Sequence, residues 1–176
     1  MIKKFNIKDK IVIITGGAGL LGYMHAEAIA EIGGIPVLFD INYSKALQKA
    51  KAINKNFGKR AIAFKGDVTK TKDITSLVNF LEKKKLEINV LINNATINPK
   101  LTKKNNGDFE KFSIKNWNNE INVGLTGYFL CSQIIGKKMR ENKKGIIINI
   151  SSDLGIVAPD QRIYKINKKN RFYKPV

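Results

Sequence analysis

The chain carries near its amino terminus the run Thr15-Gly16-Gly17-Ala18-Gly19-Leu20-Leu21-Gly22. This run lies directly between an apolar, strand-like segment and a segment with helical periodicity. Glycines let the backbone turn tightly against a ligand, and the free N–H groups at a helix start attract negative charge, so the run predicts a site for a dinucleotide pyrophosphate. A glycine-rich turn without a ligand is the alternative. The residues expected at the nucleotide are Thr15, Gly16, Gly19, Leu20, Leu21 and Gly22.

Asp40 supplies a second chemical signal. It stands at the carboxyl end of the next apolar run, about twenty residues after the turn, where a carboxylate can accept hydrogen bonds from both hydroxyls of an adenosine ribose. The same charge repels a 2′-phosphate, and no arginine lies near Asp40 in the sequence to attract one. We therefore expect NAD as cofactor in preference to NADP. A turn residue or a helix cap is the alternative role for Asp40.

Asp67 and Val68 follow the third apolar run in the same way. We expect them to cover the adenine of the bound nucleotide. Taken alone, Asp67 is equally suited to cap the helix that follows it. No metal site is expected.

Alternating strands and helices must position these residues. Short runs rich in Ile and Val alternate with longer stretches of helical periodicity, which indicates βαβ units around a parallel sheet. The predicted strands are Ile11 to Thr15, Ile35 to Asp40, Ala61 to Phe64, Asn89 to Asn93 and Gly145 to Ile150. The predicted helices run through His25–Ala30 up to Gly33-Gly34, from Ser44 as N-cap to Asn56, from Lys72 to Lys84, and from Ile114 to Arg140.

Right-handed crossovers place these strands in the order 3-2-1-4-5. The expected fold class is therefore α/β, with a Rossmann-type doubly wound parallel sheet that lacks its last strands. The fifth strand would lie at an open edge, which favours aggregation. We expect residues 1–176 to form a single NAD(P)-binding domain, since a chain of this length with 43% hydrophobic residues supports one core. Because the last strands of the sheet are missing, we expect this domain to be truncated at its carboxyl terminus.

The net charge of +18 requires a nucleic-acid partner to be considered. Nearly all of the positive charge is lysine scattered over the whole chain, and arginine, which suits bidentate contacts to bases and phosphates, occurs only four times. We therefore expect no nucleic-acid partner. A single cysteine, Cys131, fits a reducing compartment, and no stretch approaches the roughly 18 apolar residues of a membrane span. The expected location is the cytoplasm, with no membrane partner.

Together these motifs resemble the short-chain dehydrogenase/reductase family over essentially the whole chain. The glycine run is similar to the family's cofactor turn, Asp67-Val68 to its adenine contact, and Asn93-Asn94-Ala95 to the motif that stabilises its central sheet. The resemblance implies that Asn94 and Ala95 also contact the nucleotide. Leu20 stands where the shorter branch of the family has a glycine, and Gly19 is expected to supply the flexibility instead. The run also fits the extended branch, whereas Asn-Asn-Ala favours the shorter one.

The resemblance implies an NAD-dependent oxidoreductase that transfers hydride between a nicotinamide and an alcohol or carbonyl substrate. Asn122, five residues after Trp117, matches the family's catalytic asparagine, which helps to hold a water relay. Ser152 matches the serine that polarises the substrate oxygen; alternatively, Ser151 or Ser152 ends the strand by bonding to the backbone. In the family a tyrosine exchanges a proton with the substrate, and a lysine four residues later supports it.

Tyr164 and Lys168 have the spacing of that tyrosine and lysine. The residues between and after them are bulky and polar, whereas the family's pair stands on a well-packed helix, so the alternative is a pair beyond Val176 that this chain lacks. The segment Ala158-Pro159-Asp160-Gln161 resembles gluconate 5-dehydrogenase-like and sugar-biosynthesis members, which implies a sugar or polyol substrate. Full-length relatives are expected to be homo-oligomers. We expect truncation to impair activity, with a non-catalytic nucleotide-binding fragment or module as the alternative function.

Overall fold

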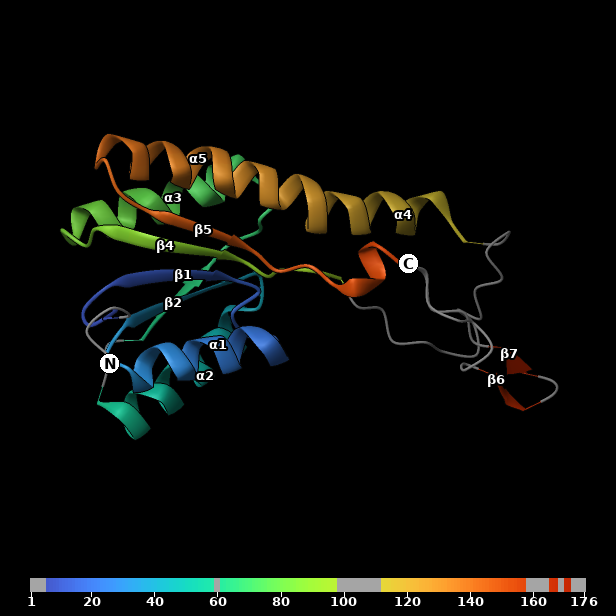
Figure 1. Ribbon diagram of the computed structural model, residues 1–176, viewed down its shortest axis with the longest axis horizontal. Coiled ribbons are helices and arrows are strands. Elements are labelled where there is room, and N and C mark those ends of the chain that lie inside the picture. Colours follow the sequence, from blue (N-terminus) through green and yellow to red (C-terminus); the bar gives the residue numbers. More distant parts are fainter. Residues whose placement is uncertain (1–5, 59–60, 98–111, 158–164, 168–169, 172–176) are drawn as a thin grey trace.

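The computed structural model describes residues 6–58, 61–97, 112–157, 165–167 and 170–171. Within these ranges a parallel five-stranded sheet has the order β3-β2-β1-β4-β5, as predicted (Figure 1). The strands are β1 (Ile11–Thr15), β2 (Ile35–Asp40), β3 (Ile62–Lys65), β4 (Ile88–Asn93) and β5 (Ile146–Asn149). The helices are α1 (Leu20–Glu31), α2 (Tyr43–Phe57), α3 (Thr71–Lys83), α4 (Ile114–Ile121) and α5 (Gly127–Glu141).

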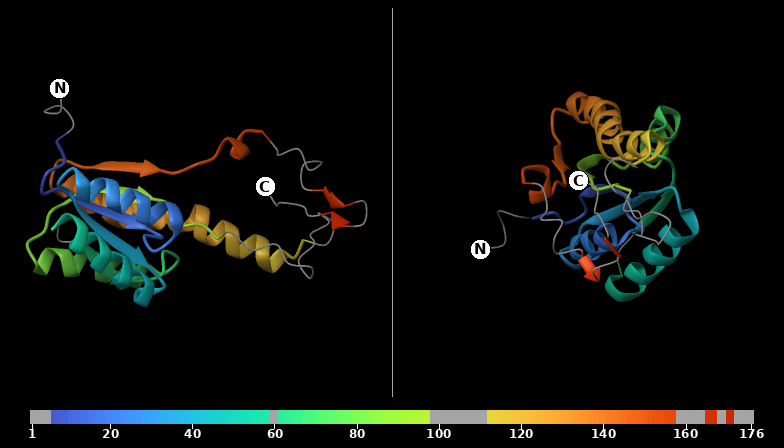
Figure 2. Two further views of the ribbon diagram at one scale, coloured as in Figure 1. Left: turned by 90° about the horizontal axis from the view of Figure 1, so that it is seen from below. Right: turned by 90° about the vertical axis from the view of Figure 1, so that its right-hand side faces the viewer.

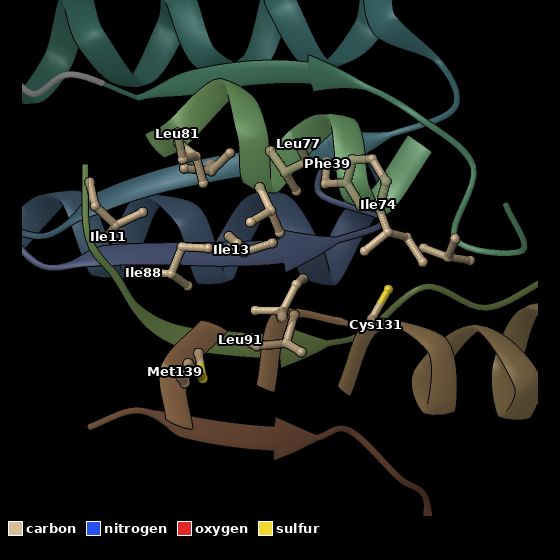
Figure 3. Close-up of a cluster of buried hydrophobic side chains, with 14 of the residues drawn as sticks. Ile11, Ile13, Phe39, Ile74, Leu77, Leu81, Ile88, Leu91, Cys131 and Met139 are labelled. Atoms are coloured by element: carbon tan, nitrogen blue, oxygen red, sulfur yellow. The ribbon is translucent and has the colours of Figure 1, made fainter. Parts of the chain in front are cut away.

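Helices cover both faces of the sheet, with α1 and α2 on one side and α3 and α5 on the other (Figure 1). Every residue of β1 is buried, which explains why its sequence is continuously apolar and does not alternate. Alternate strand residues serve two separate cores, so that Ile13 and Phe39 pack toward α3 and α5, while Ile14 and Leu38 pack toward α1 and α2. Figure 3 shows the first core, where side chains of α3 and α5 meet those of β1 and β4.

The observed element ends correct the sequence prediction in a few places. The strand predicted from Ala61 begins and ends one residue later, and the cap predicted at Ser44 is wrong. Asn42 is the N-cap of α2, because its side chain accepts a hydrogen bond from the Lys45 backbone N–H at 3.1 Å. Helix α3 has Lys70 at its N-cap position, so the alternative that Asp67 caps this helix is also wrong.

The predicted long helix is present, with an interruption that the sequence did not reveal. A π-helical segment, Asn122–Thr126, joins α4 to α5 without a break in the helical path. Figures 1 and 2 show that α4 extends beyond the end of the sheet, whereas α5 lies along it. A π segment adds one residue to a helical turn and is common at functional sites. In this helix it begins at Asn122, the residue that matched the family's catalytic asparagine.

Strand β5 forms an edge of the described sheet and pairs in parallel with β4, with Ile92 opposite Ile148. Its isoleucines are 39–60% exposed, in contrast to the fully buried β1. A short antiparallel hairpin was not predicted; it consists of β6 (Lys165–Asn167) and β7 (Asn170–Arg171) and forms a separate sheet. No helix among the described residues is long and apolar enough to cross a membrane, and no group of side chains there is arranged to hold a metal ion.

Candidate nucleotide-binding site

The glycine-rich turn lies at the carboxyl ends of the strands, between β1 and α1. The chain passes from β1 to β2 on one side of the sheet's centre, while β4 pairs with β1 on the other side. Strand order therefore reverses at β1, and ligands of doubly wound sheets bind in the crevice at such a point. The sequence-predicted residues at the ends of β1, β2 and β4 are all brought to this edge.

Two glycines of the turn are required by its geometry. Gly16 has a φ of +64°, a left-handed conformation that side chains disfavour. A Cβ on Gly22 would lie 2.3 Å from the Gly16 carbonyl oxygen, so the first turn of α1 packs directly on the backbone of the turn. Gly19, which we expected to supply flexibility, has a φ of −68° and a ψ of 175°, which any residue can adopt. Gly16, and not Gly19, is therefore the position at which the turn needs the backbone freedom of a glycine.

The amino terminus of α1 is open to a ligand. Its N-cap, Gly19, has no side chain to accept from the first backbone N–H groups, and no acidic residue occupies the first helical turn. These N–H groups and the helix dipole together favour an anion such as a phosphate. Leu20 and Leu21, which start the helix, are 79% and 54% exposed. Their side chains supply no charge.

Asp40 connects the end of β2 to the glycine turn. One carboxylate oxygen, Oδ2, accepts a hydrogen bond from the Ala18 backbone N–H at 2.9 Å. The other, Oδ1, accepts from the Asn42 N–H at 2.8 Å, which makes Asp40 a turn residue as well. Asp40 is half-buried beside the glycine turn. Its two roles are compatible, since an ionised carboxylate has about four lone-pair sites and two of them remain for ribose hydroxyls.

Thr15 supports the turn from below. Its side chain is completely buried, and Oγ1 accepts hydrogen bonds from the backbone N–H groups of Asn94 and Ala95 at 2.9 and 3.0 Å. The Asn94 side chain donates in turn to the Thr15 carbonyl at 3.0 Å. Ala95 also lies close to the turn, because a Cβ on Gly16 would come within 3.0 Å of its Cα. These contacts fix the end of β1 against the end of β4.

The Asp67-Val68 segment follows β3 and packs against the long helix. Asp67 Oδ1 accepts from both the backbone N–H and the hydroxyl of Thr69, while the Asp67 N–H donates to the Asp73 carboxylate at 2.9 Å. Val68 is 7% exposed, and a Cβ on Gly127 would lie 2.8 Å from its Cγ2. The segment is thus held rigidly at the same edge of the sheet as Asp40.

Asn93 organises a buried polar contact that the sequence motif indicated only in part. Its Nδ2 donates to Ser132 Oγ on α5 at 3.0 Å and to Asn149 Oδ1 on β5 at 2.9 Å. Asn93 is completely buried, so the loss of these partners would leave its amide desolvated. The sequence analysis did not identify Ser132, because helical periodicity does not indicate a hydrogen-bond partner 39 residues away in the chain. The contact ties the strand that precedes Ser152 to the centre of the sheet.

Tyr128, also missed, holds the end of β5 from the long helix. Its hydroxyl donates to the Ile150 carbonyl at 3.3 Å, and burial raises the pKa of this phenol. Two residues further on, Ser152 is exposed, and its hydroxyl donates to the Asp153 carboxylate at 2.9 Å. Asn122 is also exposed, at the start of the π segment.

Tyr164 and Lys168 lie outside the described residues. The described segment between them, Lys165–Asn167, forms the strand β6 rather than a helix. This differs from the helix on which the resemblance would place a tyrosine–lysine pair.

A surface hollow of about 420 Å³ lies away from this edge, at the amino-terminal end of β4. Its lining includes Glu82 and Lys138, which form an ion pair, and Ile88. It contains none of the residues predicted to bind the nucleotide. The edge of the sheet at the glycine turn is the better candidate site, because its donors and acceptors converge there.

Comparison with known proteins agrees with this geometry. Residues 10–165 match the family model described as short chain dehydrogenase. The chain belongs to the short-chain dehydrogenase/reductase family. It is 32% identical over 161 residues to an NAD-dependent glycerol dehydrogenase of Listeria innocua, covering 92% of this chain and 59% of that protein. The chain thus spans little more than half the length of this curated relative.

Solved structures share the fold as well. The crystal structure of an NAD⁺-bound xylitol dehydrogenase superposes with a TM-score of 0.77 at 22% identity, covering 87% of this chain and 56% of that one. An L-sorbose reductase from Gluconobacter frateurii, complexed with NADPH and L-sorbose, superposes with a TM-score of 0.75 at 20% identity, covering 86% and 55%. Because one fold neighbour holds NAD⁺ and the other NADPH, the fold itself does not decide between these cofactors.

The residues at the crevice fit a dinucleotide. Because Gly22 has no Cβ, the start of α1 can lie close to the backbone of the turn. The first N–H groups of α1 have no side-chain cap, and the Asp40 carboxylate lies beside the turn. A pyrophosphate and a ribose require these three features.

Proposed function

We propose that this chain binds NAD and belongs to an enzyme that transfers hydride between the nicotinamide and the alcohol or carbonyl carbon of a small polyol or sugar. The observation that carries the proposal is the Asp40 carboxylate, hydrogen-bonded to the Ala18 N–H of the glycine turn. A carboxylate at this position suits the two hydroxyls of an unmodified ribose and disfavours a 2′-phosphate. The polyol assignment draws on the glycerol dehydrogenase relative.

In this proposal the residues of the turn bind the cofactor. Gly16, Gly19 and Gly22 allow the backbone to approach the pyrophosphate, and the N–H groups of Leu20 and Leu21 donate to it. Thr15, Asn94 and Ala95 hold the turn and the end of β4 in place. Asp67 and Val68 border the adenine. Bound NAD supplies the hydride acceptor or donor.

The proposed chemistry at the substrate is proton transfer and polarisation. Ser152, exposed beyond β5, donates a hydrogen bond to the substrate oxygen, and Asn122, at the start of the π segment, helps to hold a water that relays the proton. Tyr164 and Lys168 are the tyrosine and lysine that the spacing proposes for the proton exchange, unless a pair beyond residue 176 serves this role. We further propose that residues 1–176 act as one nucleotide-binding domain, in the cytoplasm, within a homo-oligomer when the protein is full length, and without nucleic-acid or membrane partners.

A non-catalytic nucleotide-binding module is the second candidate. The observation that favours it is the strand Lys165–Asn167, which stands between Tyr164 and Lys168 where the catalytic pair would need a helix. In such a module the site at the glycine turn binds NAD, but no hydride transfer follows.

Calorimetric titration of the chain with NAD tests the cofactor assignment, with Asp40→Ala as the altered site and Asp9→Ala, on the first loop, as the matched charge control. We expect Asp40→Ala to weaken NAD binding at least about a hundredfold, since it removes two charge-assisted hydrogen bonds to ribose worth about 1.5–3 kcal/mol each. Equal binding by both variants and the wild type would refute the assignment.

Reduction of NAD at 340 nm with glycerol, xylitol and sorbitol then separates the two candidates. Turnover that is lost in Ser152→Ala supports the oxidoreductase. Tight NAD binding without turnover on any alcohol or carbonyl supports the module.

A further inference from the structure

The fold places a lysine next to Asp40 that the linear sequence does not associate with it. Strands β2 and β3 pair in parallel, and the last register pair is Asp40 with Lys65, each the final residue of its strand. The Gly66 N–H, one residue further, donates to the Asp40 carbonyl at 3.1 Å. Neighbouring strands lie about 4.7–4.9 Å apart, so the backbones of Asp40 and Lys65 are separated by one strand spacing.

Both side chains leave the sheet on the same face. The preceding register pair, Phe39 and Phe64, turns toward the core under α3, with ring centroids 6.2 Å apart. Because successive side chains of a strand alternate between faces, Asp40 and Lys65 both project toward the side of α1 and α2, where the glycine turn lies. The lysine therefore stands beside the subsite for the adenosine ribose.

The two charges do not neutralise each other within the described part of the chain. Both Asp40 oxygens accept backbone hydrogen bonds, from Ala18 and Asn42. Ion pairs among the described residues involve Lys138 and Lys144 but not Lys65, which is exposed. The flexible stem and compact charge of a lysine let Lys65 meet an anion without a fixed geometry.

We propose that Lys65 is a second determinant of cofactor choice, which attracts the 2′-phosphate of NADP and so opposes Asp40. This inference rests on the proposed function, since it concerns the same nucleotide site. A phosphate monoester carries a charge of about −1.5 to −2 at pH 7, so it gains from a lysine on the neighbouring strand and loses from the carboxylate. The site thus prefers NAD moderately instead of excluding NADP.

The test compares ligands that differ only in the 2′-phosphate. Dissociation constants are measured by calorimetry for adenosine 5′-monophosphate against adenosine 2′,5′-bisphosphate, and for NAD against NADP. The proteins are the wild type, Lys65→Gln, Asp40→Asn and the double variant. Lys55→Gln, which removes the same charge from the last turn of α2, is the matched control.

We expect Lys65→Gln to weaken binding of the 2′-phosphorylated ligands about three- to tenfold, the range for an exposed pair with a multiply charged partner, and to leave NAD within about twofold. In the Asp40→Asn background the 2′-phosphorylated ligands bind more tightly, and the loss caused by Lys65→Gln is at least as large. This loss shrinks in 0.5 M salt, because an exposed ammonium group is screened. Lys55→Gln leaves the ratio of the two affinities unchanged.

An equal effect of Lys65→Gln on both members of each ligand pair, or no effect on either in both backgrounds, would overturn the role of Lys65 while leaving the NAD site intact. A wild-type chain that binds none of the four ligands would instead refute the proposed function, and the role of Lys65 with it.

Discussion

The Thr15 hydroxyl is the most heavily used side-chain group beneath the glycine turn, and Thr15→Val tests its contribution to stability. Oγ1 accepts from the N–H groups of Asn94 and Ala95 and donates to the Ile92 carbonyl at 3.4 Å, in a side chain that is completely buried. Valine fills nearly the same volume but has no acceptor. The substitution therefore leaves two backbone donors at the end of β4 without their partner.

The magnitude follows from the burial of the two donors. A buried donor left without a partner costs about 1–3 kcal/mol. Ala95 is 8% exposed, so loss of the partner of its N–H should cost most of that amount. Asn94 is half-buried, so water can partly replace the partner of its N–H. We expect Thr15→Val to lower the free energy of unfolding by about 2–4 kcal/mol, a large share of the roughly 5–15 kcal/mol typical of a domain.

Urea unfolding followed by far-UV circular dichroism measures this change, with Thr15→Ser as the control. Serine keeps the hydroxyl and removes one buried methyl group, which costs about 0.5–1.5 kcal/mol. The reasoning predicts that the valine variant is clearly less stable than the serine variant at an unchanged m-value. If the two variants are equally stable, the hydroxyl does not connect β1 to β4 as described.

Four further predictions extend the test to other elements. Gly22→Ala should disrupt the turn and abolish NAD binding, because its Cβ would lie 2.3 Å from the Gly16 carbonyl oxygen, whereas Gly124→Ala, with nothing within 4 Å, should leave binding unchanged in the same calorimetric titration. Burial raises the pKa of the Cys131 thiol from 9.0 to about 12, so native protein should resist a thiol reagent at pH 8 that labels it readily in urea; equal labelling rates would contradict this burial. Because the raised pKa stabilises the fold below about pH 9 and this contribution is lost as the pH rises toward 12, stability should fall more steeply there in the wild type than in Cys131→Ala. Tyr128→Phe should lower the free energy of unfolding by about 0.5–1.5 kcal/mol through loss of the hydrogen bond to the Ile150 carbonyl, and a denaturation midpoint identical to that of the wild type would argue against this bond.

Patterns local to the sequence predicted most of the fold. The alternation of apolar runs with helical periodicity located all five strands of the sheet to within a residue or two, and the handedness of the crossovers gave their order. The prediction of helix starts failed where more than one nearby residue could serve as the N-cap. Ser44 and Asn42 are both good caps, and the choice depends on where the backbone leaves β2, which Asp40 fixes through its hydrogen bond to the Asn42 N–H.

Some residues of the candidate site could likewise be identified from the sequence, whereas others were revealed only by the structure. Glycine spacing and a carboxylate after the second strand are visible in the linear sequence, because the close backbone approach and the ribose contact need those residue types. The partners Ser132 and Tyr128 were not visible, since they act on β4 and β5 from a helix whose local pattern gives no sign of them. The π segment at Asn122 was also missed, as helical periodicity does not distinguish one extra residue in a turn.

By itself, the sequence determined that this chain has a glycine turn between a strand and a helix, a carboxylate at the next strand end and the motifs of an oxidoreductase family. Only the tertiary structure decided which residue lies next to Asp40 on the neighbouring strand. Asp40 and Lys65 are 25 positions apart in the chain, and the register between β2 and β3 makes them neighbours. Register depends on the packing of whole strands, such as Phe39 against Phe64, and not on any local preference of the two charged residues.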